Sequence, residues 1–214
     1  MQKTIITTED NVNLSALWWP AEAVRSVLLL HMMPATKESW TELAEKLAQA
    51  GMNVLAIDLR GHGESQGGDY KEFTPDQHQQ YILDAEAAME FLRRHYALGE
   101  IFLGGASIGA NIAIKYMAKH PQVLKGFALS AGLDYYGVKA IDDIPKLQPT
   151  QNIFLAAARD DIRKSGGDCG KMAEELYDAA GGKKEKLIFE TGGHGTDMFV
   201  SHPELYDKIV EFLG

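Results

Sequence analysis

The chain has 214 residues, a length that predicts one compact domain over residues 1–214 and excludes a large second one. Hydrophobic residues make up 45% of the sequence and charged residues 24%, values typical of a soluble globular protein and far from those of a disordered chain. The 21 basic and 30 acidic side chains give a formal net charge of −9, so nucleic acid is not an expected partner.

Cysteine content and the early part of the chain indicate the compartment. Cys169 is the only cysteine, so no internal disulfide and no cysteine-rich zinc site can form. Residues 1–8 lack the basic segment and apolar run of a signal peptide. The longest apolar stretch nearby, around residues 27–33, is far shorter than the about 20 residues that span a bilayer. These features predict a soluble, cytoplasmic protein without a membrane partner.

Eight short apolar segments are predicted to be strands. The first two flank the turn-forming residues 9–11 and predict an antiparallel pair at one edge of a sheet. Most of the others are too apolar to alternate, as is typical of parallel strands covered on both faces. In chain order the predicted strands are residues 5–8, 13–19, 26–30, 53–57, 101–104, 126–130, 152–157 and 186–190.

Helices are predicted between these strands from apolar residues at helical spacing and from glycine or proline stop signals. Residues 131–151 contain two prolines and are predicted to form a loop with one small helix. Alternating strands and helices predict an α/β fold on a mostly parallel sheet. The predicted helices are residues 40–48, 82–92, 107–119, 171–180 and 203–213.

A candidate nucleophile follows the strand at residues 101–104. Gly105, Ser107 and Gly109 form a G-x-S-x-G motif between this strand and the next helix. Such a sharp turn strains the serine backbone, and glycines two residues before and after it avoid collisions. The hydroxyl would stand at the C-terminal edge of the sheet, where free N–H groups of the helix can stabilise an oxyanion.

Nucleotide binding is a poorer interpretation of the glycines. A phosphate loop needs Lys-Ser or Lys-Thr where Ala110 and Asn111 stand. The third glycine of a dinucleotide-binding motif is missing after Gly61 and Gly63. We therefore expect no cofactor.

Candidate partners for Ser107 follow later strands. Asp160 and Asp161 come after the strand at residues 152–157, and His194 stands between glycines after the last strand. The order Ser, Asp, His, together with residues 28–31 and 58–65, resembles the α/β-hydrolase superfamily over nearly the whole chain. Within it, the chain is most similar to the compact lidless serine esterases and the dienelactone-hydrolase-like group.

The resemblance implies an α/β-hydrolase fold with about eight strands, an antiparallel N-terminal edge, helices on both faces and no large lid. It also implies a catalytic triad in which Ser107 is the nucleophile and His194 the base. Either Asp160 or Asp161 would orient the imidazole. Asp161 is favoured, because in relatives with paired aspartates the second usually faces the histidine.

The oxyanion hole implied by the resemblance has two backbone donors, the N–H groups of Ile108 and Met33. Met32 stands where the family usually has glycine. Met33 and Met198 are expected to line an apolar acyl pocket. Tyr135 and Tyr136 lie either along the path of the substrate or in a surface turn.

The sequence thus predicts a serine hydrolase that cleaves a carboxylic ester with a short or exposed acyl group through an acyl-enzyme. The expected partner is a small-molecule ester or thioester. Thioester, amide or carbon–carbon bond cleavage on the same triad, and a non-catalytic binding protein on the hydrolase scaffold, are the alternatives.

A metal shared by His194 and Asp197 is not expected, since a site needs three or four ligands. The other histidines, including His31 and His62, are expected to brace loops or face solvent. The oligomeric state is not determined by the sequence.

Overall fold

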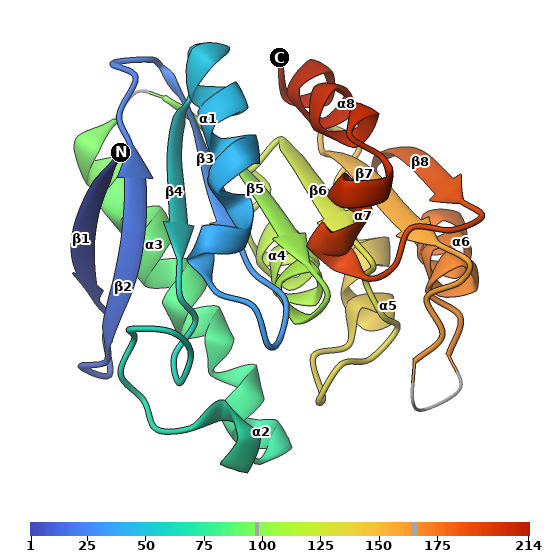
Figure 1. Ribbon diagram of the computed structural model, residues 1–214, viewed down its shortest axis with the longest axis horizontal. Coiled ribbons are helices and arrows are strands. Elements are labelled where there is room, and N and C mark those ends of the chain that lie inside the picture. Colours follow the sequence, from blue (N-terminus) through green and yellow to red (C-terminus); the bar gives the residue numbers. More distant parts are fainter. Residues whose placement is uncertain (97–98, 164–166) are drawn as a thin grey trace.

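A computed structural model describes residues 1–96, 99–163 and 167–214 of the protein. Within these residues, eight strands form a single sheet (Figure 1). In chain order the strands are β1 (Gln2–Thr7), β2 (Asn13–Trp19), β3 (Arg25–Leu30), β4 (Asn53–Ile57), β5 (Glu100–Ala106), β6 (Lys125–Leu129), β7 (Asn152–Ala158) and β8 (Lys183–Phe189).

The sheet is parallel except at its N-terminal edge. The strands lie in the order β1-β2-β4-β3-β5-β6-β7-β8, and β2 pairs antiparallel with both β1 and β4. The other neighbouring strands pair in parallel, which confirms the predicted antiparallel edge on a mostly parallel sheet. Because parallel strands end on the same side, the loops after β3 to β8 meet at one edge of the sheet, where a site can be assembled.

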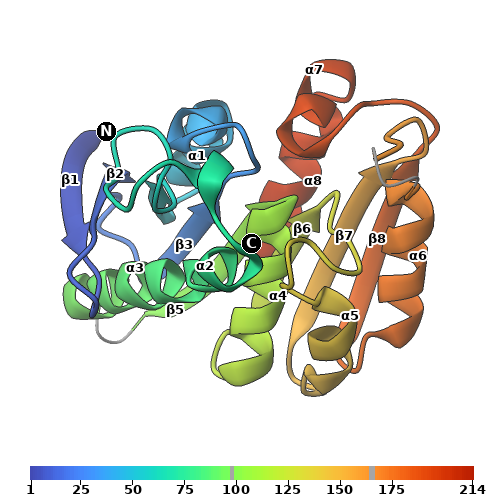
Figure 2. The ribbon, with the colours of Figure 1, turned by 90° about the horizontal axis from the view of Figure 1, so that it is seen from below.

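Helices cover both faces of the sheet, as expected (Figure 2). Along β3, Leu28 and Leu30 enter one core, whereas Val27 and Leu29 enter the other, which explains the continuous apolar run of this strand. One face carries α1 (Thr41–Gln49), α7 (Met198–Ser201) and α8 (Glu204–Leu213), and the other carries α3 (Tyr81–His95), α4 (Ile108–Lys119), α5 (Ala140–Asp143) and α6 (Cys169–Ala179). Across the described residues, none of these helices is both long and apolar enough to traverse a lipid bilayer.

Strand boundaries differ from the prediction mainly at the two edges of the sheet. β1 begins at Gln2 rather than at residue 5, and β8 covers Lys183–Phe189 rather than residues 186–190. Edge strands keep many side chains in solvent, so a run of apolar residues does not mark where they begin. Between β6 and β7 the expected small helix is α5, continued by the short 3-10 helix η3 (Ile144–Lys146), and no large lid is inserted.

Several short helices in loops were not predicted. The 3-10 helix η2 (Tyr70–Glu72) and α2 (Pro75–Gln79) follow β4, and η1 (Lys37–Trp40) precedes α1. They contain too few apolar residues to show a helical period. A signal for α2 was nevertheless present, because Thr74 and Gln77 form a reciprocal capping box.

A buried ion pair ties the loop after β3 to the loop after β4. The side chains of Lys37 and Asp58 are 1% and 0% exposed, and Lys37 Nζ lies 2.7 Å from Asp58 Oδ2. The same carboxylate accepts hydrogen bonds from the backbone N–H groups of Lys37 (2.8 Å) and Glu64 (2.9 Å). Asp58 therefore holds the two loops together through three contacts.

We expect Asp58→Ala to lower the free energy of unfolding by about 3 kcal/mol, because Lys37 keeps only the half-exposed Glu38 and Glu64 as partners and two backbone N–H groups lose their acceptor. Urea denaturation measures this change. Asp207→Asn is the matched control, since Asp207 pairs with Lys46 on the surface, where its side chain is 79% exposed. Equal, small losses in both variants would contradict the anchoring role of Asp58.

Candidate active site

Ser107 occupies a strained turn between β5 and α4. Its backbone has φ 53° and ψ −119°, and residues other than glycine rarely adopt such a positive φ. The turn is held by the hydrogen bond from Ser107 N–H to the carbonyl of Leu129, at 2.8 Å. α4 therefore begins at Ile108 rather than at the predicted residue 107, and Ser107 precedes its first free N–H groups.

The flanking glycines are required by close backbone approaches. A Cβ on Gly105 would collide with the carbonyl of Gly109, and a Cβ on Gly109 would collide with the carbonyls of Leu30 and His31. Strand β3 thus packs against the start of α4 with no room for a side chain. The spacing of the motif follows from these two contacts.

His194 and Asp161 form a hydrogen-bonded pair at the same edge of the sheet. The distance from His194 Nδ1 to Asp161 Oδ2 is 2.6 Å, and the two side chains are 13% and 5% exposed. A carboxylate can only accept, so Nδ1 carries the proton and Nε2 has a free lone pair. Asp161 follows β7 and His194 follows β8, two neighbouring parallel strands.

Asp160, the other candidate, is used differently. Its exposed carboxylate accepts hydrogen bonds from the N–H groups of Gly192 (3.0 Å) and Gly193 (3.2 Å). It therefore supports the loop that carries His194, whereas Asp161 meets the imidazole itself.

The loop that carries His194 lies against the end of β5. Gly195 N–H donates to Ser130 Oγ at 2.9 Å, and a Cβ on Gly195 would lie 3.2 Å from Cβ of Ala106, the neighbour of Ser107. Nε2 of His194 is buried and has no hydrogen-bond partner among the described residues, so it makes no bond to Ser107 Oγ. Catalytic hydrogen bonds are often loose in ligand-free sites and tighten when substrate binds.

Asp161 is held ionised by its surroundings. Burial alone would raise the pKa of this carboxyl, but hydrogen bonds from His194 and Cys169 and the charge of Arg163 outweigh burial and lower its pKa. Arg163 lies 3.4 Å from Asp161 Oδ1. An ionised carboxylate fixes the imidazole tautomer with a free Nε2.

Cys169 and Tyr135 extend this network, and sequence reasoning missed their contacts. Cys169 Sγ is buried, hydrogen-bonds to Asp161 and lies 3.5 Å from the Tyr135 hydroxyl. Burial and the neighbouring carboxylate raise the pKa of the thiol to about 12, so it stays protonated. No motif marks Cys169, because its contact depends on the pairing of Ile162 with Asp168 and on the hydrogen bond from Cys169 N–H to the carbonyl of Asp161.

One cluster has the spacing of a metal site. The ligand atoms of Asp161, Cys169 and His194 lie within 4.8 Å of one another among the described residues. Their hydrogen bonds already satisfy the cluster, and a metal would need the thiolate of Cys169, which its raised pKa disfavours. The donor set therefore fits a hydrogen-bonded network better than a metal centre.

Met32 and Gly195 fit together across the site. Met32 is 8% exposed, and a Cβ on Gly195 would lie 2.6 Å from its sulfur. The methionine that replaces the usual glycine after His31 therefore fills space that Gly195 leaves free. Met32 therefore fits beside Gly195 while the loop that carries Gly195 stays against the end of β5.

His31 braces the loop that contains Met33. Its Nε2 accepts a hydrogen bond from the N–H of Leu59 (2.9 Å), so its Nδ1 carries the proton and donates to the carbonyl of Met32 (2.8 Å). Burial, assisted by the nearby His62, lowers the pKa of His31 to about 4. The neutral ring thus links the loops after β3 and β4.

A cleft of about 570 Å³ opens at Ser107. Its walls include Met33, whose N–H group is the expected second oxyanion donor, and both tyrosines that follow β6, which favours the substrate-path interpretation of the tyrosines. The lining residues are Met33, Ser107, Asp134, Tyr135, Tyr136, Ile162 and Arg163. The expectation for Met198 was wrong: its side chain is completely buried at the start of α7, in the core that contains Trp40, and it does not reach the cleft.

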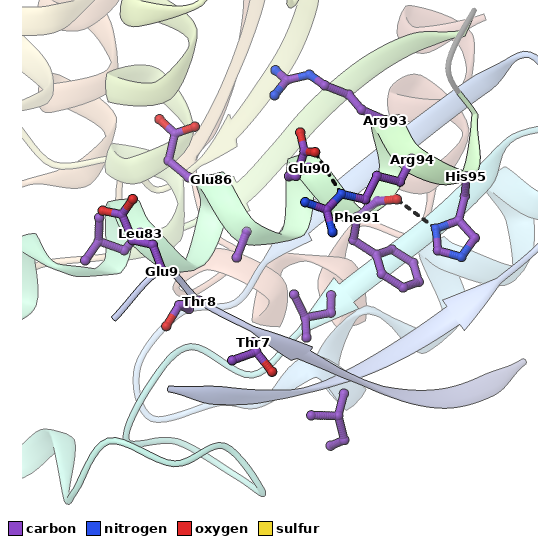
Figure 3. Close-up of a pocket in the computed structure, with 13 residues that line it drawn as sticks. Thr7, Thr8, Glu9, Leu83, Glu86, Glu90, Phe91, Arg93, Arg94 and His95 are labelled. Carbon is purple, nitrogen blue, oxygen red and sulfur yellow. Dashed lines mark hydrogen bonds and ion pairs between the residues drawn. The ribbon is translucent and has the colours of Figure 1, made fainter. Parts of the chain in front are cut away.

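A somewhat larger groove lies elsewhere, between β1 and α3. It measures about 640 Å³, and Figure 3 shows charged side chains of α3 along it. Glu90 and Arg94 pair with each other there, at 2.8 Å. Ser107, His194 and Asp161 do not line this groove. Size alone therefore does not identify the site.

Comparison with known proteins places the chain in a family. The sequence profile of the family described as "Serine aminopeptidase, S33" matches residues 21–152. The chain belongs to this family of α/β-hydrolases. The expected superfamily and fold are confirmed.

The curated relatives of this chain are named for different activities. Lipase 3 of a Moraxella species is 26% identical over 140 residues, which are 64% of this chain and 41% of the lipase. A proline iminopeptidase of Clostridioides difficile is 31% identical over 116 residues, 52% of this chain and 36% of the peptidase. The chain thus spans well under two thirds of the length of these curated relatives.

The similarity in fold extends further than the similarity in sequence. An esterase of Pyrococcus furiosus superposes with a TM-score of 0.81 at 23% identity, covering 99% of this chain and 91% of the esterase. An esterase of Exiguobacterium antarcticum superposes with a TM-score of 0.76 at 16% identity, covering 99% of both chains. At such identities the likeness shows the fold alone.

The neutral state of His31 predicts a pH dependence of stability. The pKa of His31 is lower in the folded protein than in the unfolded chain, so the unfolded chain binds more protons below about pH 6.5. The free energy of unfolding should therefore fall as the pH falls from 6.5 towards 4. Urea denaturation of the wild type and His31→Gln measures this, and the variant should lose part of the slope. His95→Gln, on the exposed surface, is the control. An unchanged slope in His31→Gln would contradict the role of His31.

Proposed function

We propose that this protein is a serine hydrolase that cleaves carboxylic esters through an acyl-enzyme. The observation that carries the proposal is the hydrogen-bonded pair of His194 and Asp161 on the loops beside the strained turn at Ser107. A protonated Nδ1 held by a carboxylate leaves Nε2 as a base, and the turn presents a hydroxyl in the cleft. Together these three features favour acyl transfer to a serine hydroxyl.

In the proposed mechanism, Ser107 Oγ gives its proton to His194 Nε2 and forms a bond to the ester carbonyl carbon. The carbonyl oxygen becomes an oxyanion that accepts hydrogen bonds from the N–H groups of Ile108 and Met33. Its collapse breaks the bond to the alcohol, which leaves with the proton from Nε2. A water molecule then gives a proton to Nε2 and bonds through its oxygen to the acyl carbon. The bond from this carbon to Ser107 Oγ breaks, Ser107 takes the proton from Nε2, and the carboxylic acid is released.

The environment of Asp161 suits this role. The carboxylate remains ionised while the imidazole gains a positive charge, so the pair is stabilised as the proton moves. Asp160 braces the glycines before His194 in this proposal and takes no part in proton transfer.

The first test uses p-nitrophenyl acetate. The wild type should release a burst of p-nitrophenolate equal to the enzyme concentration, because acylation precedes slower deacylation. Ser107→Ala should lose the burst and at least about 10³-fold in kcat/KM. A fluorophosphonate should label the wild type at Ser107, as peptide mass spectrometry can measure. A wild type with neither burst nor label would refute the esterase proposal and favour a non-catalytic binding protein.

The second test separates the two aspartates. Asp161→Asn should lower kcat about 10⁴-fold, since an amide at this position favours the wrong imidazole tautomer. Asp160→Asn should cause a far smaller loss, because an amide oxygen still accepts one of the two loop N–H bonds. Steady-state kinetics on the same ester provide the comparison. A larger loss in Asp160→Asn would reverse the assignment.

Removal of an N-terminal residue from a peptide is the second candidate function. The description of the family as a serine aminopeptidase and the similarity to proline iminopeptidases favour it. An exposed carboxylate, Asp134, lines the cleft and offers a partner for a free amino group. Parallel assays on prolyl p-nitroanilide and p-nitrophenyl acetate would distinguish the two activities, with an acyl-CoA to detect thioester cleavage.

A further inference from the structure

A second chamber of about 420 Å³ adjoins the cleft at Ser107. The two hollows share two wall residues, Met33 of the oxyanion loop and Tyr136 of the turn after β6. The two hollows therefore adjoin each other at these side chains. The residues that line it are Met33, Pro34, Tyr70, Lys71, Phe73, His78 and Tyr136. We call this hollow the aromatic chamber.

The walls of the aromatic chamber are mostly rings in contact with one another. The ring centroids of His78 and Tyr136 are 4.4 Å apart, and those of Phe73 and His78 are 5.5 Å apart. Tyr70 stacks on the buried ring of His62 at 3.9 Å, with an interplanar angle of 15°. The rings are thus supported by neighbours and present a firm aromatic surface.

The segments that supply these rings are fixed in place. The capping box of Thr74 and Gln77 begins α2, which carries His78. The turn that carries Tyr136 is closed by the hydrogen bond from Gly137 N–H to Asp134 Oδ1 at 2.7 Å, and a Cβ on Gly137 would lie 3.0 Å from Gln79 Nε2. The chamber is therefore formed where this turn packs against α2, before any ligand binds.

We propose that the aromatic chamber binds an aromatic ring of the substrate, which makes aryl-bearing esters the preferred class. This inference rests on the proposed ester hydrolysis at Ser107. A substrate ring gains edge-to-face or offset contacts with Phe73, His78 and Tyr136 that a saturated ring of similar size does not gain in full. The shared walls at Met33 and Tyr136 put the aromatic chamber next to the cleft at Ser107.

The test compares matched esters. Benzyl acetate and cyclohexylmethyl acetate have leaving alcohols of similar size and acidity, so their ratio of kcat/KM reports ring recognition on the alcohol side. Methyl phenylacetate and methyl cyclohexylacetate do the same on the acyl side. The wild type should prefer the aromatic member of at least one pair by about fivefold. Ethyl acetate serves as the small reference substrate.

Two variants and a control locate the preference. Phe73→Ala should remove most of the aromatic preference while the rate on ethyl acetate stays within about twofold, and Tyr136→Asn should also remove most of the preference. Tyr136 is 54% exposed and asparagine tolerates its positive φ of 53°, so this variant keeps the fold. Phe91→Ala removes a partly exposed ring from the distant groove of Figure 3 and should leave the preference unchanged.

A binding experiment keeps the inference separate from the proposed function. Benzyl alcohol should bind Ser107→Ala more tightly than cyclohexylmethanol does, and Tyr136→Asn should abolish the difference, as saturation-transfer NMR can measure. Absence of ester turnover with intact aromatic binding would refute the hydrolysis and support the chamber. Ester turnover without aromatic preference, or a preference that Phe73→Ala and Tyr136→Asn leave unchanged, would overturn the chamber.

Discussion

Three backbone segments approach one another at Ser107 with no side chains between them. Gly105 and Gly109 allow the end of β5, the start of α4 and the end of β3 to come into contact. The left-handed backbone of Ser107 costs about 1–3 kcal/mol, which the burial of β5 and α4 on either side must offset. The turn puts the hydroxyl and the free N–H groups of α4 at the same edge as the loops after β7 and β8. The rest of the candidate site depends on this position.

Buried polar contacts hold the neighbouring loops in register with that turn. Lys37 and Asp58 join the loops after β3 and β4, and the neutral ring of His31 bridges the same loops through two backbone groups. Arg60 adds a second buried pair to Asp84 of α3 at 2.8 Å. Buried charges stabilise little in net terms, but mispairing them is costly, so they favour one arrangement of the loops. The loop that contains Met33 thereby has a defined course.

The electrostatics around His194 match the proposed proton transfer. Asp161 accepts hydrogen bonds from the imidazole and from a thiol that stays protonated, and Arg163 adds a positive charge. These contacts keep the carboxylate ionised despite its burial, and the unpartnered Nε2 is left to accept a proton. Asp134 and Arg163 lie in the wall of the cleft, whereas four rings and Lys71 line much of the aromatic chamber.

The sequence by itself determined the α/β fold, the antiparallel edge and the turn at Ser107, because apolar runs, stop signals and paired glycines act locally along the chain. It also supplied Asp160, Asp161 and His194 in the order that the family shows, and the resemblance favoured Asp161 but left Asp160 open. Only the tertiary structure decided that Asp161 meets the imidazole, that Cys169 joins it, that Met198 is buried and that α2 packs against the turn of Tyr136. These outcomes depend on which strand ends and loops become neighbours, and residues distant in sequence carry no local signal of the side chains they will meet.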